Sequence, residues 1–236
     1  MGYKSTYELL QPVIAAIDKT FTILSIVDNG SFNYTLNACN TLWATQGFSV
    51  TIGGNSYVIQ SIVPNVSITV QGSVVLTAMS FQLYAPVFYH GTIKATSTDL
   101  ERPVNGTLLS TDKLPMIWLH EPTDETYEEN PKKAIAFRAK VELYFMIDGD
   151  MAVTNDDAYT YFIKPMRNLI DSFMSAVKSA KTINENLITT SAPKDFARWG
   201  VYMGKDGGEK TIFNRPMSGT KFEVEIPFIK SSAICC

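Results

Sequence analysis

The sequence predicts an α+β protein in which an antiparallel sheet packs against one or two helices and carries an inserted small all-β barrel or sheet. Three observations support this class. An amphipathic helical pattern opens the chain, a long stretch with two-residue periodicity follows, and the remainder combines longer strand patterns with one strong helical pattern. We therefore divide the chain into an α+β domain of residues 1–20 and 80–236 and an inserted β domain of residues 21–79.

The opening helix is predicted within residues 5–19. Ser5 and Glu8 have the spacing of a capping box, in which the two residues satisfy free backbone N–H groups of the first turn. Pro12 has no N–H to donate, so we expect a kink or a late start of the helix at that position. The apolar residues on one helical face are Leu9, Leu10, Val13, Ile14 and Ile17.

The inserted domain is predicted from short alternating segments separated by turn residues. Asp-Asn-Gly, Gly-Gly-Asn and Pro-Asn mark the corners, because glycine supplies the positive φ that tight turns need. Short strands at this spacing form a strongly curved sheet or a barrel, here nearly uncharged. The expected strands are residues 21–27, 32–37, 48–52, 56–63, 66–70 and 74–78.

The next part of the chain predicts strands separated by loops. Residues 81–95 are apolar and β-prone, with Pro86 marking a break or an edge. Residues 96–113 are polar and predict a loop. The continuous apolar run 114–119 is typical of a strand buried on both faces. Residues 123–133 are charged and contain a proline, and they predict a second loop.

A long half-exposed strand is predicted over residues 136–148. Its polar side chains Arg138, Lys140 and Glu142 face away from the apolar set. The apolar set is Phe137, Ala139, Val141, Leu143, Phe145 and Ile147.

The strongest helical pattern and a final strand close the chain. Pro165 lies inside the helical pattern, which predicts that the helix begins there or kinks. Its apolar residues recur at three- and four-residue spacing: Phe162, Met166, Leu169, Ile170, Phe173 and Val177. In the final strand, residues 221–229, two sets of side chains face opposite ways: Phe222, Val224, Ile226 and Phe228 against Lys221, Glu223 and Glu225.

Composition limits the function classes. Hydrophobic residues make up 45% of the chain and charged residues only 18%, and the formal net charge is −3. A dedicated nucleic-acid binder normally carries a basic face, so this class is disfavoured. No window approaches 18 uninterrupted apolar residues, and the start lacks the pattern of a signal peptide, so we expect no membrane contact.

The chemistry-bearing residues do not form a recognisable catalytic set. His90 and His120 have no second histidine or cysteine at metal-ligand spacing, and no nucleophile pairs with them. Nucleotide-binding and hydrolase motifs are also absent from the sequence. We predict that the protein is not an enzyme, with no catalytic, cofactor-binding or metal-binding residues and no cofactor.

Two acidic segments have alternative interpretations. Asp148, Asp150, Asp156 and Asp157 offer oxygen ligands that hard cations prefer, but Asp157 or Asn155 serves equally well as the N-cap of the following helix. The second segment contains Asp124, Glu125, Glu128 and Glu129, followed by Lys132 and Lys133. Its composition predicts a solvated loop or a charged contact with a neighbouring subunit.

The three cysteines do not form a disulfide framework. They are Cys39, Cys235 and Cys236, an odd number with two adjacent at the end of the chain. This pattern indicates a reducing compartment.

The order of elements resembles the tail-terminator and tail-completion class of bacteriophage neck proteins over roughly residues 1–20 and 110–236. The resemblance lies in the opening helix, the strand in KLPMIWLHEP with its charged loop, the strand KAIAFRAKVELYFMID, the next helix and the closing GTKFEVEIPFIK. The inserted segment, TFTILSIVDNGSFNYTL through YVIQSIVPNVSITVQG, looks like small β domains in ring proteins of crAss-like phages.

The resemblance implies a structural virion protein of the neck or tail connector, assembled in the host bacterial cytoplasm. It would form a homo-oligomeric ring of six- or twelve-fold symmetry that joins portal to tail and contacts other phage neck, portal and tail proteins. Genomic DNA would pass through the lumen without specific binding, and acidic side chains lining the lumen would suit this passage because like charges repel.

Two other function classes remain open from the sequence. A β-rich module that recognises a polysaccharide or a host-surface ligand would need exposed aromatic side chains on one side, whereas Trp43, Trp118 and Trp199 lie in three separate segments. A hydrolase would need His90 or His120 to act with partners that spacing does not reveal.

Overall fold

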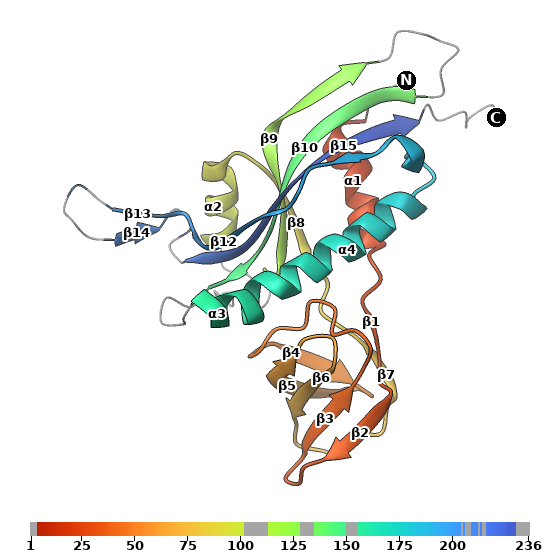
Figure 1. The fold of residues 1–236 in the computed structure, drawn as a ribbon, viewed down its shortest axis with the longest axis vertical. Helices are drawn as coiled ribbons and strands as arrows, with labels where there is room; N and C mark the ends of the chain where they lie inside the picture. Colours follow the sequence, from red (N-terminus) through yellow and green to blue (C-terminus); the bar gives the residue numbers. More distant parts are fainter. Residues whose placement is uncertain are drawn as a thin grey trace.

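A computed structural model describes residues 4–101, 113–127, 135–149, 155–203, 205, 209–211, 213 and 216–229. It confirms a mixed α+β protein with antiparallel sheets and few helices. Figure 1 shows a small seven-stranded sheet at one end of a larger unit, in which helices lie beside a six-stranded sheet.

The opening helix α1 (Thr6–Ala15) begins at its capping box, as predicted. The Ser5 side chain accepts from the Glu8 backbone N–H, and Glu8 Oε2 accepts from the Ser5 N–H at 2.8 Å. Pro12 lies inside the helix, so the predicted late start is wrong. Its ring faces solvent, where water can satisfy the carbonyl that lacks an N–H partner.

The small sheet contains seven short strands in the order β1-β7-β4-β5-β6-β3-β2, and every pair is antiparallel. Inward side chains such as Leu36, Ile59 and Ile68 are buried, which matches the predicted two-residue periodicity. The strands are β1 (Thr20–Thr22), β2 (Ser25–Asp28), β3 (Asn33–Asn37), β4 (Ser49–Ile52), β5 (Asn55–Val63), β6 (Ser67–Gln71) and β7 (Ser80–Gln82).

Two strand predictions in this sheet are wrong. The predicted strand 21–27 is two strands, because the chain changes partner between them: Ile23 N–H donates to the Met79 carbonyl and Leu24 N–H to the Asn37 carbonyl. Residues 74–78 are not a strand. They alternate in sequence but find no ladder partner, and the short β7 after them pairs with β1 instead.

The larger sheet has the order β11-β15-β10-β9-β8, and β12 also pairs with β15. All its neighbours are antiparallel except β8 and β9, which run parallel. Its strands are β8 (Val87–Gly91), β9 (Met116–Tyr127), β10 (Ile135–Asp148), β11 (Thr189–Thr190), β12 (Lys194–Trp199) and β15 (Met217–Ile229); β13 (Val201–Met203) and β14 (Glu209–Thr211) form a separate hairpin.

The long strands confirm the apolar alternation but differ from the predictions in two places. Residues 114–119 are buried, as expected, yet β9 continues through Tyr127, so the predicted loop is wrong for residues 123–127. Opposite charges across the ladder favour this extension, because Asp124 lies opposite Lys140. Residues 128–133 of that predicted loop lie outside the described residues. β10 is half-exposed only in its first part, since residues 144–147 are all buried.

A helix, α2 (Ile93–Glu101), replaces the start of the loop predicted over residues 96–113. Thr96 and Leu100 are buried, and with Ile93 they form a sparse helical stripe in a polar segment. The buried ammonium of Lys113 donates to the Asp99 and Leu100 carbonyls at 2.8 and 2.7 Å, which caps the C-terminus of this helix. Residues 102–112 lie outside the described residues.

The main helix is longer than predicted and contains a π-turn. α3 (Asn155–Ala158), η2 (Tyr159–Ile163) and α4 (Lys164–Ser179) follow without a break, and Pro165 is the second residue after the π-turn. A π-turn rearranges the backbone hydrogen bonds just where proline cannot donate one. The predicted face of α4 is confirmed as buried: Met166, Leu169, Ile170, Phe173 and Val177. A short 3₁₀ helix, η3 (Glu185–Leu187), precedes β11.

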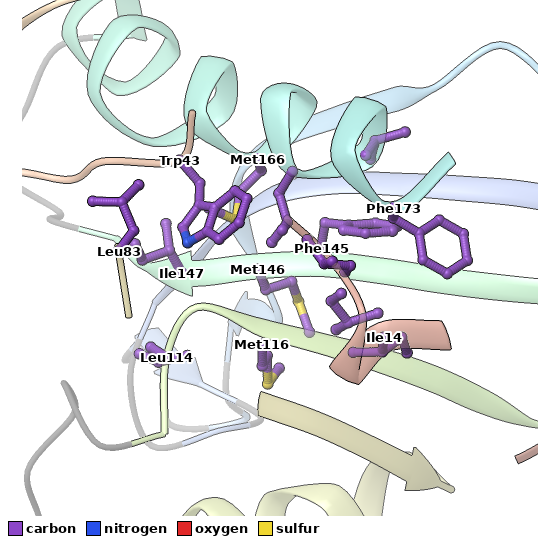
Figure 2. Packing of buried hydrophobic residues seen from close by; sticks show 14 of the residues in the cluster. Ile14, Trp43, Leu83, Leu114, Met116, Phe145, Met146, Ile147, Met166 and Phe173 are labelled. Carbon is purple, nitrogen blue, oxygen red and sulfur yellow. The ribbon is translucent and has the colours of Figure 1, made fainter. Parts of the chain in front are cut away.

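Trp43 joins the small sheet to the core of the larger unit. Its indole has no exposed surface, and Figure 2 places it in the same part of the core as Met166 of α4, Ile147 of β10 and Leu83. The Trp43 Nε1–H donates to the Tyr84 carbonyl, and the Tyr84 hydroxyl donates back to the Trp43 carbonyl, both at 3.0 Å. Both parts therefore share one hydrophobic core.

The junction is also closed by a polar contact. Asn168 Nδ2 of α4 donates to the Leu42 carbonyl at 2.5 Å, next to Trp43.

Of the helices in the part of the chain that the structure describes, none is long and apolar enough to cross a membrane.

Candidate functional site

The candidate site is the polar face of the larger sheet, on β9, β10 and β15. Side chains alternate between two faces along each strand, and the apolar face of β10 packs with α4 into the core. The register places Glu142 beside His120 on one side and Glu223 on the other. The polar residues predicted separately on strands 136–148 and 221–229 therefore meet on one surface, which we call the open face. It consists of His120, Arg138, Lys140, Glu142, Lys221, Glu223 and Glu225.

Lys221 bridges two carboxylates that lie opposite each other in the ladder. Its Nζ is 2.6 Å from Glu142 Oε2 and 3.1 Å from Glu223 Oε1. The Tyr144 hydroxyl donates to Glu142 Oε1 at 2.6 Å, and His120 Nδ1 lies 3.6 Å from the same oxygen. Burial alone would raise the pKa of Glu142, but the hydrogen bonds from Lys221 and Tyr144 outweigh it and hold the pKa below its usual value.

The next rows of the open face also balance their charges. Arg138 Nη1 lies 3.3 Å from Glu225 Oε1. Lys140 lies between Glu225 and Asp124 in the ladder, and its side chain is exposed. A shallow depression beside it is lined partly by Thr189, Thr190 and Ser191. The face is thus mixed in charge and half-exposed, which is typical of a docking surface and not of an enclosed pocket.

An aromatic cluster borders the open face at the start of β9. Trp118 is fully buried and lies 5.8 Å from Trp199 and 4.9 Å from Tyr144, measured between ring centroids. Trp199 stacks on Phe213 at 5.2 Å. Burial and the hydrogen bond to Glu142 raise the pKa of Tyr144, so its hydroxyl stays protonated and keeps donating.

The two histidines lie on neighbouring strands of the same sheet. His90 on β8 is exposed, its Nδ1 is 3.1 Å from Glu121 Oε1, and its ring centroid is 3.9 Å from that of Tyr7 on α1. His120 faces Glu142 instead. Each imidazole thus has a carboxylate as its neighbour, Glu121 for His90 and Glu142 for His120.

The structure describes only part of the aspartate loop. No group of three or more potential ligands gathers there or elsewhere among the described residues. Asp156 and Asp157 lie in the first turn of α3, so Asp157 is not the N-cap, and Asn155 is already the first helical residue. Their charges favour a helix N-terminus. Asp150 lies outside the described residues.

The part of the second acidic segment that the structure describes, residues 124–127, belongs to β9 and binds α1 through a hydrogen bond. The Thr6 hydroxyl donates to Glu125 Oε1, and Tyr127 donates to the other carboxylate oxygen at 2.7 Å. Burial would raise the pKa of Glu125, but the hydrogen bonds from Thr6 and Tyr127 keep it below its usual value.

Cys39 is exposed and free, while Cys235 and Cys236 lie outside the described residues.

Replacing Lys221 by methionine is expected to lower the free energy of unfolding at pH 7 by about 1–2 kcal/mol, because Glu142 and Glu223 would then face each other without a cation. Urea denaturation followed by circular dichroism measures this loss. Adding Glu223→Gln should recover part of it. The matched control, Lys140→Met, removes an exposed lysine and should change stability by less than about 0.5 kcal/mol. Equal losses in the two variants would contradict the bridging role.

The same network predicts an acid-dependent loss of stability. The folded-state pKa of Glu142 lies below its ordinary value of 4.5, so its stabilisation is present above that pH and is lost as the pH falls through the folded-state pKa. The difference in unfolding free energy between the wild-type chain and Lys221→Met should therefore shrink as the pH is lowered from about 5 to about 3, the range in which carboxyl groups ordinarily become protonated. A difference that stays constant over this range would show that Glu142 does not provide it.

The open face therefore offers paired charges and hydrogen-bonding groups on one surface of the sheet. Sequence reasoning missed the contributions of Trp43, Lys113 and Asn168. Trp43 and Lys113 lie in segments without periodicity, and Asn168 lies on α4 but contacts Leu42, 126 residues away in the sequence. Comparison of the chain with protein-family models and with curated proteins gives no match.

Proposed function

We propose that this chain is a structural virion protein that forms a homo-oligomeric ring in the neck of a tailed bacteriophage, between portal and tail. The observation that carries the proposal is the open face: a sheet surface formed by three paired strands, with balanced charges and side chains that stay partly exposed. A ring requires that one surface of each copy dock onto a different surface of the next. Lys140 and Asp124, exposed and opposite in charge, would contribute to that contact.

The finer fold assignment is part of the same proposal. We regard the larger unit as tail-terminator-like and the small sheet as an inserted barrel. The barrel interpretation is supported by the pairing of residues 20–28. The first part of this segment, β1, pairs with β7 at one end of the strand order, and the second part, β2, pairs with β3 at the other end. A bent strand that pairs at both ends brings the edges of a sheet together.

The ring would have six- or twelve-fold symmetry and would surround the DNA. A net charge of −3 supports passage without adhesion, because a surface without excess cations gains nothing from counterion release. Other neck, portal and tail proteins would contact its two rims. The polysaccharide-binding alternative lacks a supporting observation: Trp43 and Trp118 are buried, and Trp199 stacks on Phe213.

Imaging of the neck in purified phage particles tests this proposal. We expect mass spectrometry to find the chain in particles and cryo-electron microscopy to place it as a closed ring with acidic side chains toward the lumen. Lys140→Glu should reduce the yield of complete particles at least ten-fold. Lys94→Glu, an equal charge change on the first turn of α2, should not, since acidic residues are tolerated there. Absence of the chain from particles would refute the proposal.

A further inference from the structure

Exposed apolar side chains are concentrated on the small sheet. Nine of the twelve large hydrophobic residues that are exposed in the described part of the chain lie between residues 24 and 79. Over residues 20–93 the sequence contains one charged side chain, Asp28. Such a surface offers no cations to nucleic acid or to anionic lipid, and it favours an uncharged partner.

Eight of these nine residues form two patches at opposite ends of the β3–β6 pair, and Val27 belongs to neither. Backbone hydrogen bonds connect the first: Leu24 N–H reaches Asn37, the next residue Ala38 donates to Val66, and Val66 donates to Val63. Met79 accepts from Ile23, the neighbour of Leu24. These four side chains, which we call the Leu24 patch, are 53–59% exposed: Leu24, Val63, Val66 and Met79.

The second patch lies where β3 begins and β6 ends. Gly72 N–H donates to the Phe32 carbonyl, and the Tyr57 hydroxyl donates to the Val74 carbonyl. Val58 lies opposite Gln71 in the ladder. We call this set the Phe32 patch, and it consists of Phe32, Val58, Val74 and Val75. The five residues of β3 separate the two patches by about 13 Å.

The backbone at Phe32 indicates a functional position. Ser31 and Phe32 have φ of +53° and +59°, a region that bulky residues rarely adopt, and Phe32 is 44% exposed. Asparagine or glycine would adopt this turn at lower energy. Neither the turn nor the core requires an aromatic ring here, whereas a contact with another molecule would.

We propose that the Leu24 patch of one copy docks onto the Phe32 patch of the next copy, which makes the small sheet a contact between ring neighbours. The inference rests on the proposed ring. Two different uncharged patches on one chain provide the head-to-tail contact that a closed ring needs, and identical neutral surfaces approach without like-charge repulsion. Trp43 fixes the small sheet to the main core, so each copy presents its patches in the same orientation.

Sedimentation velocity of the purified full chain, from micromolar to millimolar concentration, tests the contact. The wild-type chain should associate with increasing concentration. Phe32→Asn should weaken association at least ten-fold while its thermal unfolding temperature stays equal or rises, because asparagine tolerates positive φ. Leu24→Asp should weaken association equally. The control Gln60→Glu adds a charge at an exposed position of β5 outside both patches and should associate like the wild-type chain.

Mixing the two blocked variants tests the head-to-tail arrangement. Each retains one intact patch, so the mixture should form dimers although each variant alone stays monomeric. A wild-type chain that remains monomeric at millimolar concentration, or variants that associate like the wild-type chain, would overturn the inference. If the variants self-associate normally but are lost from particles, the patches bind a different neck protein, which also overturns it.

The result separates this inference from the proposed function. A closed ring in particles that assembles equally well with Phe32→Asn would refute the patch contact and leave the ring protein intact. A chain that associates through the patches in solution but is missing from particles would refute the ring function alone.

Discussion

Replacing Trp43 by alanine is expected to lower the free energy of unfolding by about 3–5 kcal/mol, the range for truncation of a buried large aromatic side chain. The indole has no exposed surface and lies in the core with Met166 and Ile147. Its removal also leaves the Tyr84 carbonyl without the indole N–H donor. Urea denaturation monitored by circular dichroism measures the loss.

The variant should also separate the unfolding of the two sheets. In the wild-type chain, the shared core couples them, and we expect a single transition. The cavity in Trp43→Ala weakens this coupling, so the small sheet and the larger unit should unfold at different urea concentrations. Trp43→Phe is the matched control: it retains an aromatic ring and loses mainly the hydrogen bond, and it should cost about 1–2 kcal/mol. Equal losses for alanine and phenylalanine would show that Trp43 does not fill the junction.

Elements with a clear local period were predictable from the sequence. The capping box of Ser5 and Glu8 lies within one turn, and the buried face of α4 repeats every three or four residues. The alternation on β10 and β15 likewise identified both polar sets. That these sets share one surface depends on the register between Glu142 and Glu223, which a single strand pattern cannot show.

Elements that depend on distant partners were not predictable in this way. α2 is polar apart from a sparse stripe, and its C-terminus is capped by Lys113, which is 14 and 13 residues away from the two carbonyls it binds. The extension of β9 through Tyr127 depends on pairing with β10. Trp43 lies in a segment without a period, so its burial follows only from the tertiary fold.

The same limit applies to the candidate site. The sequence indicated docking surfaces and no reactive centre, and it identified the polar residues of the open face. It could not show the two apolar patches, because Leu24, Val63, Val66 and Met79 come from separate segments that only the sheet brings together. A positive φ at Phe32 is likewise invisible in a sequence pattern.

Replacing Gly219 by alanine is expected to destabilise the larger sheet by at least about 3 kcal/mol, above the usual range for a single added methyl group. A Cβ at this position would lie 2.0 Å from the Phe145 carbonyl oxygen and 3.0 Å from Met146 Cα. Both atoms belong to the backbone of β10, so no side-chain rotation can relieve the contact. The ladder between β10 and β15 would have to separate locally, which breaks backbone hydrogen bonds near the Met146–Gly219 pair.

A second glycine supplies the control for this prediction. Gly47 has φ of +84°, and a Cβ added there would meet no atom of the described residues within 4 Å, so Gly47→Ala costs only backbone strain, about 1 kcal/mol. Thermal unfolding should rank the chains as wild-type, Gly47→Ala and Gly219→Ala in order of decreasing stability. If Gly219→Ala unfolds at the temperature of Gly47→Ala, β10 and β15 do not approach each other as closely as the ladder requires. A misfolded Gly219→Ala chain recovered only from inclusion bodies would support the prediction, provided that Gly47→Ala is soluble under the same conditions.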